Sequence, residues 1–219
     1  MRIGVAAAIR EFAARELAAD RFIHLLGIVL GLVGAIVLIV IAAIWRRLGD
    51  LPPILIYAAG LVAMLGCSAA YNVFHGSRWR SWLRRCDHAA IFAMIAGTYT
   101  PFTLLGLEGT WSIALTAVIW GVAGLGIAIK LWQPGRIEKV SVALYLALGW
   151  IGVVAAGPFI AAFDPVILSL LAAGGILYSS GVVFHVWHRL PYQNAIWHGF
   201  VLAAAAVHYA AVMGIVVEA

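Results

Sequence analysis

Seven long apolar segments, separated by short polar stretches, form the main pattern of this chain. They lie at about 22–44, 53–74, 88–107, 111–130, 139–160, 165–187 and 195–217. The hydrocarbon core of a bilayer is about 30 Å thick and takes roughly 20 apolar residues in helical form. Helices can also satisfy their backbone hydrogen bonds within lipid. The pattern therefore predicts an all-α, polytopic membrane protein with seven transmembrane helices.

Composition excludes a soluble globule. Hydrophobic residues make up 65% of the 219 positions and charged residues only 11%, and the mean hydropathy is +1.05. Such a chain has too little polar surface to cover itself in water. Residues 1–21 mix basic and acidic side chains, so we expect them to form a cytoplasmic amphipathic segment. Residues 22–219 then make a single seven-helix transmembrane domain.

The distribution of basic residues predicts the orientation of the chain. With the N-terminus in the cytoplasm, 12 of the 14 Lys and Arg residues fall on the cytoplasmic side, and only Arg46 and Arg47 fall outside. This is the positive-inside pattern, and it places the C-terminus outside. Topology and anionic lipid headgroups then account for the net charge of +5. Membrane lipids are thus the expected partners, and no nucleic acid is expected.

Polar residues of the kinds that catalysis or ligand binding needs lie at one set of span ends. They are Asp20 with His24, Ser68 with Asn72, Asp87 with His88, and Asn194 with His198. Three of these pairs stand four residues apart, so each shares one helix face. Odd spans begin and even spans end on the cytoplasmic side, so all four pairs lie at one membrane depth. Polar groups at that depth are costly unless paired, hydrated or ligating, which predicts a single functional site.

A structural explanation of the same residues remains open. His24, His75, His88, His185 and His188 all lie near span ends, where water can hydrate an imidazole.

Asp87 follows Arg84 and Arg85, and its carboxylate can pair with them or stabilise a helix N-terminus. His208 lies in the middle of its span, where we expect a hydrogen bond to a neighbouring helix.

Four blocks of sequence carry a family resemblance. They are Ser68-Ala-Ala-Tyr71-Asn72, Leu83-Arg-Arg-Cys-Asp87-His88, Ile95-Ala-Gly-Thr-Tyr-Thr-Pro-Phe102, and Asn194-Ala-Ile-Trp-His198. In this order and spacing the chain resembles the haemolysin III family, which is related to the progestin and adipoQ receptors. The resemblance covers nearly all seven spans. It implies a seven-helix protein of the bacterial inner membrane with a zinc site on the cytoplasmic side.

The wider superfamily includes membrane-embedded hydrolases that cleave amide bonds of lipids. Its pattern is Ser-x3-His in the second span, Asp in the third, and His-x3-His in the seventh. The matching residues here are Ser68 and Asn72, then Asp87, then Asn194 and His198. Two of three expected imidazoles are therefore asparagine. An earlier Glu-x3-Asn-x3-His element is altered as well, and reads Glu16, Asp20, His24.

Zinc is the cofactor that the resemblance implies, but the matching residues do not favour it. A catalytic zinc site usually takes three imidazole, thiolate or carboxylate ligands from the protein. His198 and Asp87 are the best candidates here, and His24, His75 or His88 could replace the missing imidazoles. In the alternative without metal, the amides of Asn72 and Asn194 bridge His198 or a lipid headgroup by hydrogen bonds.

These residues support three functions. In the favoured one, the polar site binds or senses lipid. In the second, Asp87 or a metal activates a water, and Ser68 stabilises the oxyanion as a lipid amide or ester is hydrolysed. The weakest is a pore, because no span carries a repeated polar stripe to line a water path.

Overall fold

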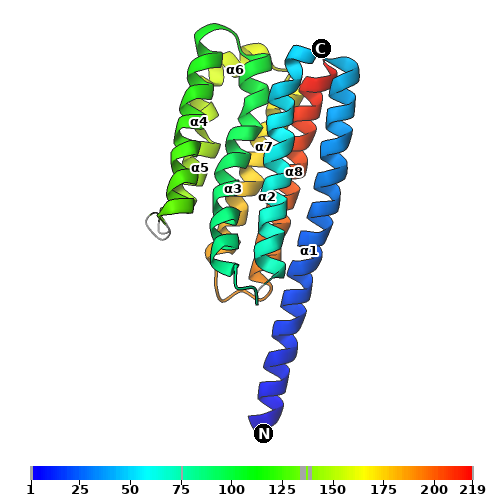
Figure 1. The fold of residues 1–219 in the computed structure, drawn as a ribbon, viewed down its shortest axis with the longest axis vertical. Helices are drawn as coiled ribbons and strands as arrows, with labels where there is room; N and C mark the ends of the chain where they lie inside the picture. The colour runs from blue at the N-terminus through cyan, green and yellow to red at the C-terminus, as the bar shows by residue number, and fades with distance from the viewer. Residues whose placement is uncertain (1, 75, 134–136, 138–139, 219) are drawn as a thin grey trace.

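The computed structural model describes residues 2–74, 76–133, 137 and 140–218, with side chains from Ala13 onward. Within that part, seven helical spans are long and apolar enough to cross a membrane. They are Ala13–Trp45, Leu48–Val73, Arg80–Gly106, Gly109–Trp132, Ser141–Ala162, Pro165–Val186 and Gln193–Val217. The prediction of an all-α chain with seven long apolar helices is confirmed. The helices stand side by side as a bundle (Figure 1).

Eight α-helices and three short turns of other helix types build these spans. The α-helices are α1 (Arg2–Trp45), α2 (Leu51–Val73), α3 (Arg80–Pro101), α4 (Gly109–Trp132), α5 (Ser141–Gly149), α6 (Ala156–Ala162), α7 (Pro165–Val186) and α8 (Gln193–Val217). The 3-10 turns are η1 (Leu48–Asp50) and η3 (Ile151–Ala155), and η2 (Phe102–Gly106) is a π-helical turn.

Prolines and one aspartate fix several helix ends. The first turn of α2 contains proline, whose fixed φ suits a helix start. At the start of α7, the Asp164 carboxylate accepts a hydrogen bond from the Val166 backbone N–H at 2.7 Å, and Pro165 follows the cap. Pro101 ends α3, and because proline lacks an N–H, the chain continues through the wider turn η2.

Helix α1 is a single unbroken helix of 44 residues. Residues 2–21 of the predicted segment therefore join the first span without a break in the backbone. At 1.5 Å per residue the helix is roughly 65 Å long, and its N-terminal part projects beyond the bundle (Figure 1). Asp20 and His24 lie where α1 enters the bundle and are buried there, with 4% and 6% of their surface exposed.

One end of the bundle, which we call the basic end, is where α2 and α7 end and α3 and α8 begin. It carries Arg78, Arg80, Arg84, Arg85 and Arg189. Arg136 and Lys139, which the sequence places on the same side, lie outside the described residues. At the opposite end the Arg46 guanidinium donates to the carbonyl of Ile215, near the end of α8, as basic residues do at helix C-termini.

Close approach of α2 and α3 positions the centre of the bundle. A Cβ on Gly97 would lie 3.3 Å from the carbonyl oxygen of Ile56, and one on Gly60 would lie 3.3 Å from that of Ala93. Gly121 and Gly124 of α4 differ, since a Cβ on either meets nothing within 4 Å. Those two glycines therefore do not bring α4 close to another helix among the described residues.

The fifth span is interrupted. Between α5 and α6 the chain forms η3, and the Tyr99 hydroxyl braces the break: it donates to the carbonyl of Gly149 at 2.6 Å and accepts from the N–H of Gly152 at 3.0 Å. The Trp150 indole N–H donates to the Ser179 hydroxyl on α7 at 3.0 Å. These bonds satisfy backbone and side-chain hydrogen-bonding groups that would have no partner in lipid.

Replacement of Gly97 should separate α2 from α3. We expect Gly97→Val to lower the free energy of unfolding by about 1–3 kcal/mol, because the added atoms press on the α2 backbone. Chemical unfolding in detergent micelles measures the change. The matched control is Gly121→Val on α4, where the side chain has open space. Equal loss in both variants would refute a special role for Gly97.

Candidate functional site

Six polar side chains from four helices meet at the basic end, and we call them the polar cluster. They are Asp20 and His24 of α1, Ser68 and Asn72 of α2, Asp87 of α3 and His198 of α8. The sequence predicted a common depth for all six residues. The structure also brings their side chains into mutual contact.

Asp20 holds both histidines through their Nδ1 atoms. Its Oδ1 lies 2.6 Å from Nδ1 of His198, and its backbone oxygen lies 2.7 Å from Nδ1 of His24. A carbonyl can only accept, so His24 donates its Nδ1–H and keeps the lone pair on Nε2. The same assignment for His198 gives an Nδ1–H donated to the carboxylate. Asp20 thereby fixes the orientation of both imidazoles, whose ring centroids are 4.3 Å apart.

The Nε2 atom of His24 faces α2. It lies 3.2 Å from the Ser68 hydroxyl oxygen and 3.2 Å from Nδ2 of Asn72. The amide of Asn72 also donates to the Ser68 carbonyl at 2.9 Å. Asn72 is buried, with 8% of its surface exposed. The amide hydrogens therefore point at acceptors on two sides, and Asn72 contacts His24 rather than His198.

Asp87 completes the polar cluster from α3. Its half-buried carboxylate interacts electrostatically with His198 and reaches the Ser68 hydroxyl. The Ser68 hydroxyl thus links the Asp87 carboxylate to the His24 imidazole, while Asp20 contacts both imidazoles directly. Acidic and basic groups that face each other in this way can exchange protons with a water or a bound ligand.

The remaining candidates from the sequence lie at the edge of the site. Asn194 lines the cavity described below, but its side chain is exposed and forms no hydrogen bond to the polar cluster among the described residues. His88 lines the cavity, and its carbonyl accepts from Tyr145. His75 lies outside the described residues. The hydrogen bond expected for His208 is confirmed, since its Nε2 lies 3.2 Å from the Leu171 carbonyl of α7.

The positions where the resemblance implies zinc ligands do not fit zinc. Asn72 uses its amide hydrogens on His24 and Ser68, and Asn194 is exposed. One imidazole, that of His198, remains, and a catalytic zinc usually takes three protein ligands. Among the described residues, one group of metal-binding type is found elsewhere: atoms of Asp20, His24 and His198 all lie within 4.8 Å of one another.

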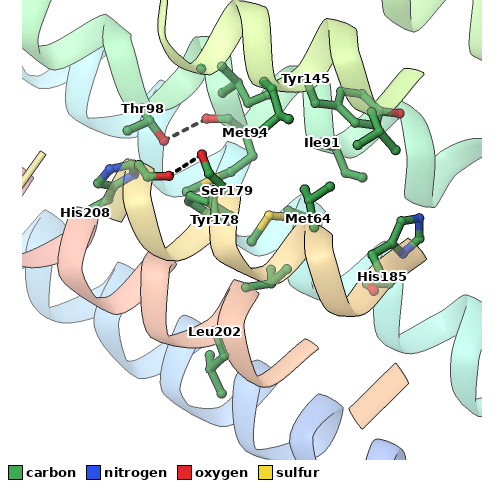
Figure 2. Close-up of a pocket in the computed structure, with 18 of the residues that line it drawn as sticks. Met64, Ile91, Met94, Thr98, Tyr145, Tyr178, Ser179, His185, Leu202 and His208 are labelled. Carbon is green, nitrogen blue, oxygen red and sulfur yellow. Dashed lines mark hydrogen bonds between the residues drawn. The ribbon is translucent and has the colours of Figure 1, made fainter. Parts of the chain in front are cut away.

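A cavity of about 740 Å³ runs from the polar cluster into the bundle. This volume lies within the range of roughly 300–1,000 Å³ that is usual for ligand pockets. The polar end is formed by His24, Ser68, Asn72, Asp87 and His198. Beyond them the wall becomes mainly apolar, with Ile91, Met94, Leu146, Leu168, Leu171 and Leu202 among its residues. Figure 2 shows Met64, Ile91 and Met94 together with His185 and His208 around this space.

The fifth span forms a side of the cavity that faces lipid. Val153 and Ile160 both line the cavity, yet 63% and 68% of their surfaces are exposed. Their side chains thus belong both to the cavity wall and to the exposed surface of the bundle. We infer that the cavity opens sideways at η3 and α6, within a span that is long and apolar enough to cross a membrane.

Two arginines stand at the polar end of the cavity. Arg80 and Arg84 are one helical turn apart on α3, line the cavity and are exposed. The Arg80 guanidinium also lies over the Tyr71 ring, 5.4 Å from its centroid. Guanidinium groups bind phosphate and carboxylate oxygens with two parallel hydrogen bonds. This end of the cavity thus offers two guanidinium groups beside the carboxylates of the polar cluster.

Comparison with known proteins gives a consistent result. Residues 16–209 match the family described as "Haemolysin-III related". The chain is 33% identical over 202 residues to "Hemolysin-3 homolog" of Bacillus subtilis, covering 92% of this chain and 95% of that protein. It is 34% identical over 199 residues to "Hemolysin-3" of Bacillus cereus, covering 91% of each.

A human protein is also similar. "Monocyte to macrophage differentiation factor" is 32% identical over 176 residues, covering 72% of this chain and 67% of that protein. The matched segments span most of the helical bundle.

The contact between Asp20 and His198 generates a prediction. Removing either partner leaves a buried polar group without its bond, so Asp20→Ala and His198→Ala should each destabilise the protein, and the double variant should lose less than the sum. We expect a coupling free energy of about 1–3 kcal/mol in a double-mutant cycle, measured by chemical unfolding in micelles. Asp20→Ala combined with His185→Ala serves as the control and should be additive. Additive losses for both pairs would disprove the coupling.

Proposed function

Since this chain belongs to the Haemolysin-III related family of multi-pass membrane proteins, we propose that it binds a membrane lipid inside the bundle. The proposal rests on one observation: a single cavity has a polar end at the polar cluster and a mainly apolar wall elsewhere. An amphipathic molecule matches this division, with its polar group at the cluster and its acyl chain along the apolar wall.

The sideways opening supports the route of such a lipid. A lipid already lies in the bilayer, and its chain can pass between lipid and cavity at Val153 and Ile160 without crossing water. Its polar group then moves toward the end where the arginines stand. We infer that the preferred lipid is anionic, because Arg80 and Arg84 face the place that its headgroup would take.

Orientation in the membrane forms part of the proposal. The basic end faces the cytoplasm, since it carries most of the described Lys and Arg residues. The membrane is the bacterial plasma membrane, as the similarity to Bacillus proteins supports. The polar cluster then lies near the inner leaflet, where anionic lipids attract basic side chains.

Lipid binding can be tested by filling the cavity. The probe is phosphatidylglycerol with a pyrene-labelled acyl chain, whose binding to the purified full-length protein quenches tryptophan fluorescence. We expect Ile91→Trp, which adds bulk to the cavity wall, to weaken binding about tenfold or more, a loss of roughly 1.4 kcal/mol. Ile113→Trp is the control, because Ile113 is 73% exposed and lies outside the cavity. Undiminished binding in Ile91→Trp would refute the proposal.

Headgroup preference is read in the same assay. Arg84→Gln should reduce the preference for phosphatidylglycerol over phosphatidylcholine, whereas Arg47→Gln, at the opposite end of the bundle, should leave it unchanged. An unchanged preference in Arg84→Gln would refute the inference about anionic lipids.

Hydrolysis of the bound lipid is a second candidate, favoured by the position of Asp87 between Ser68 and His198. In this reaction Asp87 takes a proton from water, and the hydroxide attacks the carbonyl carbon of an amide or ester. The Ser68 hydroxyl donates to the developing oxyanion. The carbon–nitrogen or carbon–oxygen bond then breaks, the leaving amine or alcohol receives the proton, and a fatty acid is formed.

Released fatty acid provides the test of this second candidate. Purified protein is incubated with a ceramide and with phosphatidylglycerol, and the free fatty acid is measured by mass spectrometry. We expect the wild type to release fatty acid. Asp87→Asn should lower the rate of release about 100-fold, in the range usual for loss of a general base, and His185→Gln should leave it unchanged. No release above that of empty micelles, or equal release by Asp87→Asn, would exclude this role for Asp87.

A further inference from the structure

We propose that the cavity contains a second polar subsite, built by Tyr178 of α7 and His208 of α8, which binds a hydroxyl group on the acyl chain of the lipid. The inference rests on the proposed lipid binding and adds the class of lipid, namely one whose chain is hydroxylated well away from its headgroup. Polar side chains in the middle of a span are costly unless they have partners, so their presence in a mainly apolar cavity indicates a function.

Both side chains lie far from the polar cluster. His208 stands ten residues after His198 in α8, and Tyr178 stands seven residues before His185, near the end of α7. At 1.5 Å per residue, these separations are roughly 15 Å and roughly 10 Å along the helix axes. Tyr178 and His208 both line the cavity, with ring centroids 5.6 Å apart. Figure 2 shows His208 and His185 at opposite ends of the drawn pocket, with Tyr178 between them.

These two residues keep hydrogen-bonding capacity that the protein does not use. The Nε2 atom of His208 lies 3.2 Å from the Leu171 carbonyl, which can only accept, so Nε2 carries the proton and Nδ1 keeps a lone pair. Neither this Nδ1 atom nor the Tyr178 hydroxyl has a hydrogen-bond partner among the described residues. Ser179 and Thr98 differ, because each donates its hydroxyl hydrogen to the carbonyl four residues earlier, at 2.8 Å.

A ligand hydroxyl matches this pair of groups. It can donate its hydrogen to Nδ1 of His208 and accept the hydrogen of the Tyr178 hydroxyl, so that all three groups are satisfied. A carbonyl oxygen can only accept and would leave Nδ1 unpaired, and a methylene group would leave both residues unpaired. Because a buried polar group without a partner costs free energy, the subsite favours a hydroxyl over either.

Glycines of α7 make room for the subsite. The His208 ring occupies the space that a Cβ on Gly174 would take. One residue further, a Cβ on Gly175 would lie 3.1 Å from the ring of Trp150. The imidazole thus packs directly against the α7 backbone. This contact holds its orientation before a ligand arrives, which lowers the entropy cost of binding.

The depth of the subsite sets the position of the hydroxyl along the chain. A C–C bond of about 1.52 Å with an angle of about 111° advances an extended chain by about 1.25 Å per carbon. With the headgroup at the polar cluster, the separation of roughly 10–15 Å corresponds to roughly eight to twelve carbons. A hydroxyl at about the tenth carbon should therefore reach Tyr178 and His208.

Competition between fatty acids tests the subsite. Full-length protein in detergent is loaded with the pyrene-labelled phosphatidylglycerol, and displacement is followed by recovery of tryptophan fluorescence. The competitors are 10-hydroxyoctadecanoic acid, octadecanoic acid and 2-hydroxyoctadecanoic acid, whose hydroxyl lies beside the carboxyl group. We expect the 10-hydroxy acid to bind about tenfold more tightly than either of the others, because only its hydroxyl reaches the subsite.

Variants assign the advantage to the two residues. Tyr178→Phe removes one oxygen and keeps the ring, so it should reduce the advantage to about twofold or less. Its affinity for octadecanoic acid should equal that of the wild type, which also shows that the fold is retained. His208→Phe should have the same effect. Tyr71→Phe is the matched control, because it removes a hydroxyl from the wall of the same cavity beside Arg80 and should keep the tenfold advantage.

The outcomes separate the subsite from the lipid binding on which it rests. Equal displacement by octadecanoic acid and its 10-hydroxy form would refute the subsite and leave lipid binding intact. A full advantage that persists in Tyr178→Phe would overturn the assignment to this residue and with it the proposed subsite. If none of the three acids displaces the probe, and unlabelled phosphatidylglycerol does not either, both proposals fail.

Discussion

A polar group in the hydrocarbon core of a bilayer has no water to bond with, and this cost governs where the polar side chains of the chain lie. Asp20 is the clearest case, because it is 4% exposed and still carries a carboxylate. The carboxylate accepts the imidazole N–H of His198 at 2.6 Å, and the backbone carbonyl of Asp20 accepts that of His24 at 2.7 Å. Since the first of these bonds joins α1 to α8, and His24 in turn joins α1 to α2, the polar cluster also fixes how three helices meet.

The block from Gly97 to Pro101 on α3 serves the site from a distance. Gly97 brings α3 against the α2 backbone, Thr100 accepts the indole N–H of Trp120 on α4 at 3.0 Å, and Tyr99 braces the interrupted fifth span. These three residues therefore each position a different neighbouring helix. Asp87 belongs to the same helix, so its place in the polar cluster depends on these contacts.

Much of the fold was predictable because apolar runs determine transmembrane spans, and the predicted spans agree with the helices apart from their ends. The break at Trp150 was missed, since apolar side chains continue through it and only the partner, Tyr99 of α3, makes the broken backbone tolerable. In the site, the spacing of Asp20 and His24 predicted a shared face. The choice of Asp20 over Asp87 as the hydrogen-bond acceptor of His198 depends on how α1 and α8 pack, which no local pattern contains.

The sideways opening at Val153 and Ile160 changes the reference state for any ligand. A molecule that enters from the bilayer moves from one hydrocarbon environment into another, so burying its acyl chain in the cavity gains little free energy from the hydrophobic effect. Occupancy then follows the mole fraction of that molecule in the leaflet, in competition with every neighbouring lipid, rather than its solubility in water. Discrimination falls to the few polar atoms at the polar end of the cavity, and a single hydrogen bond there can outweigh many methylene groups.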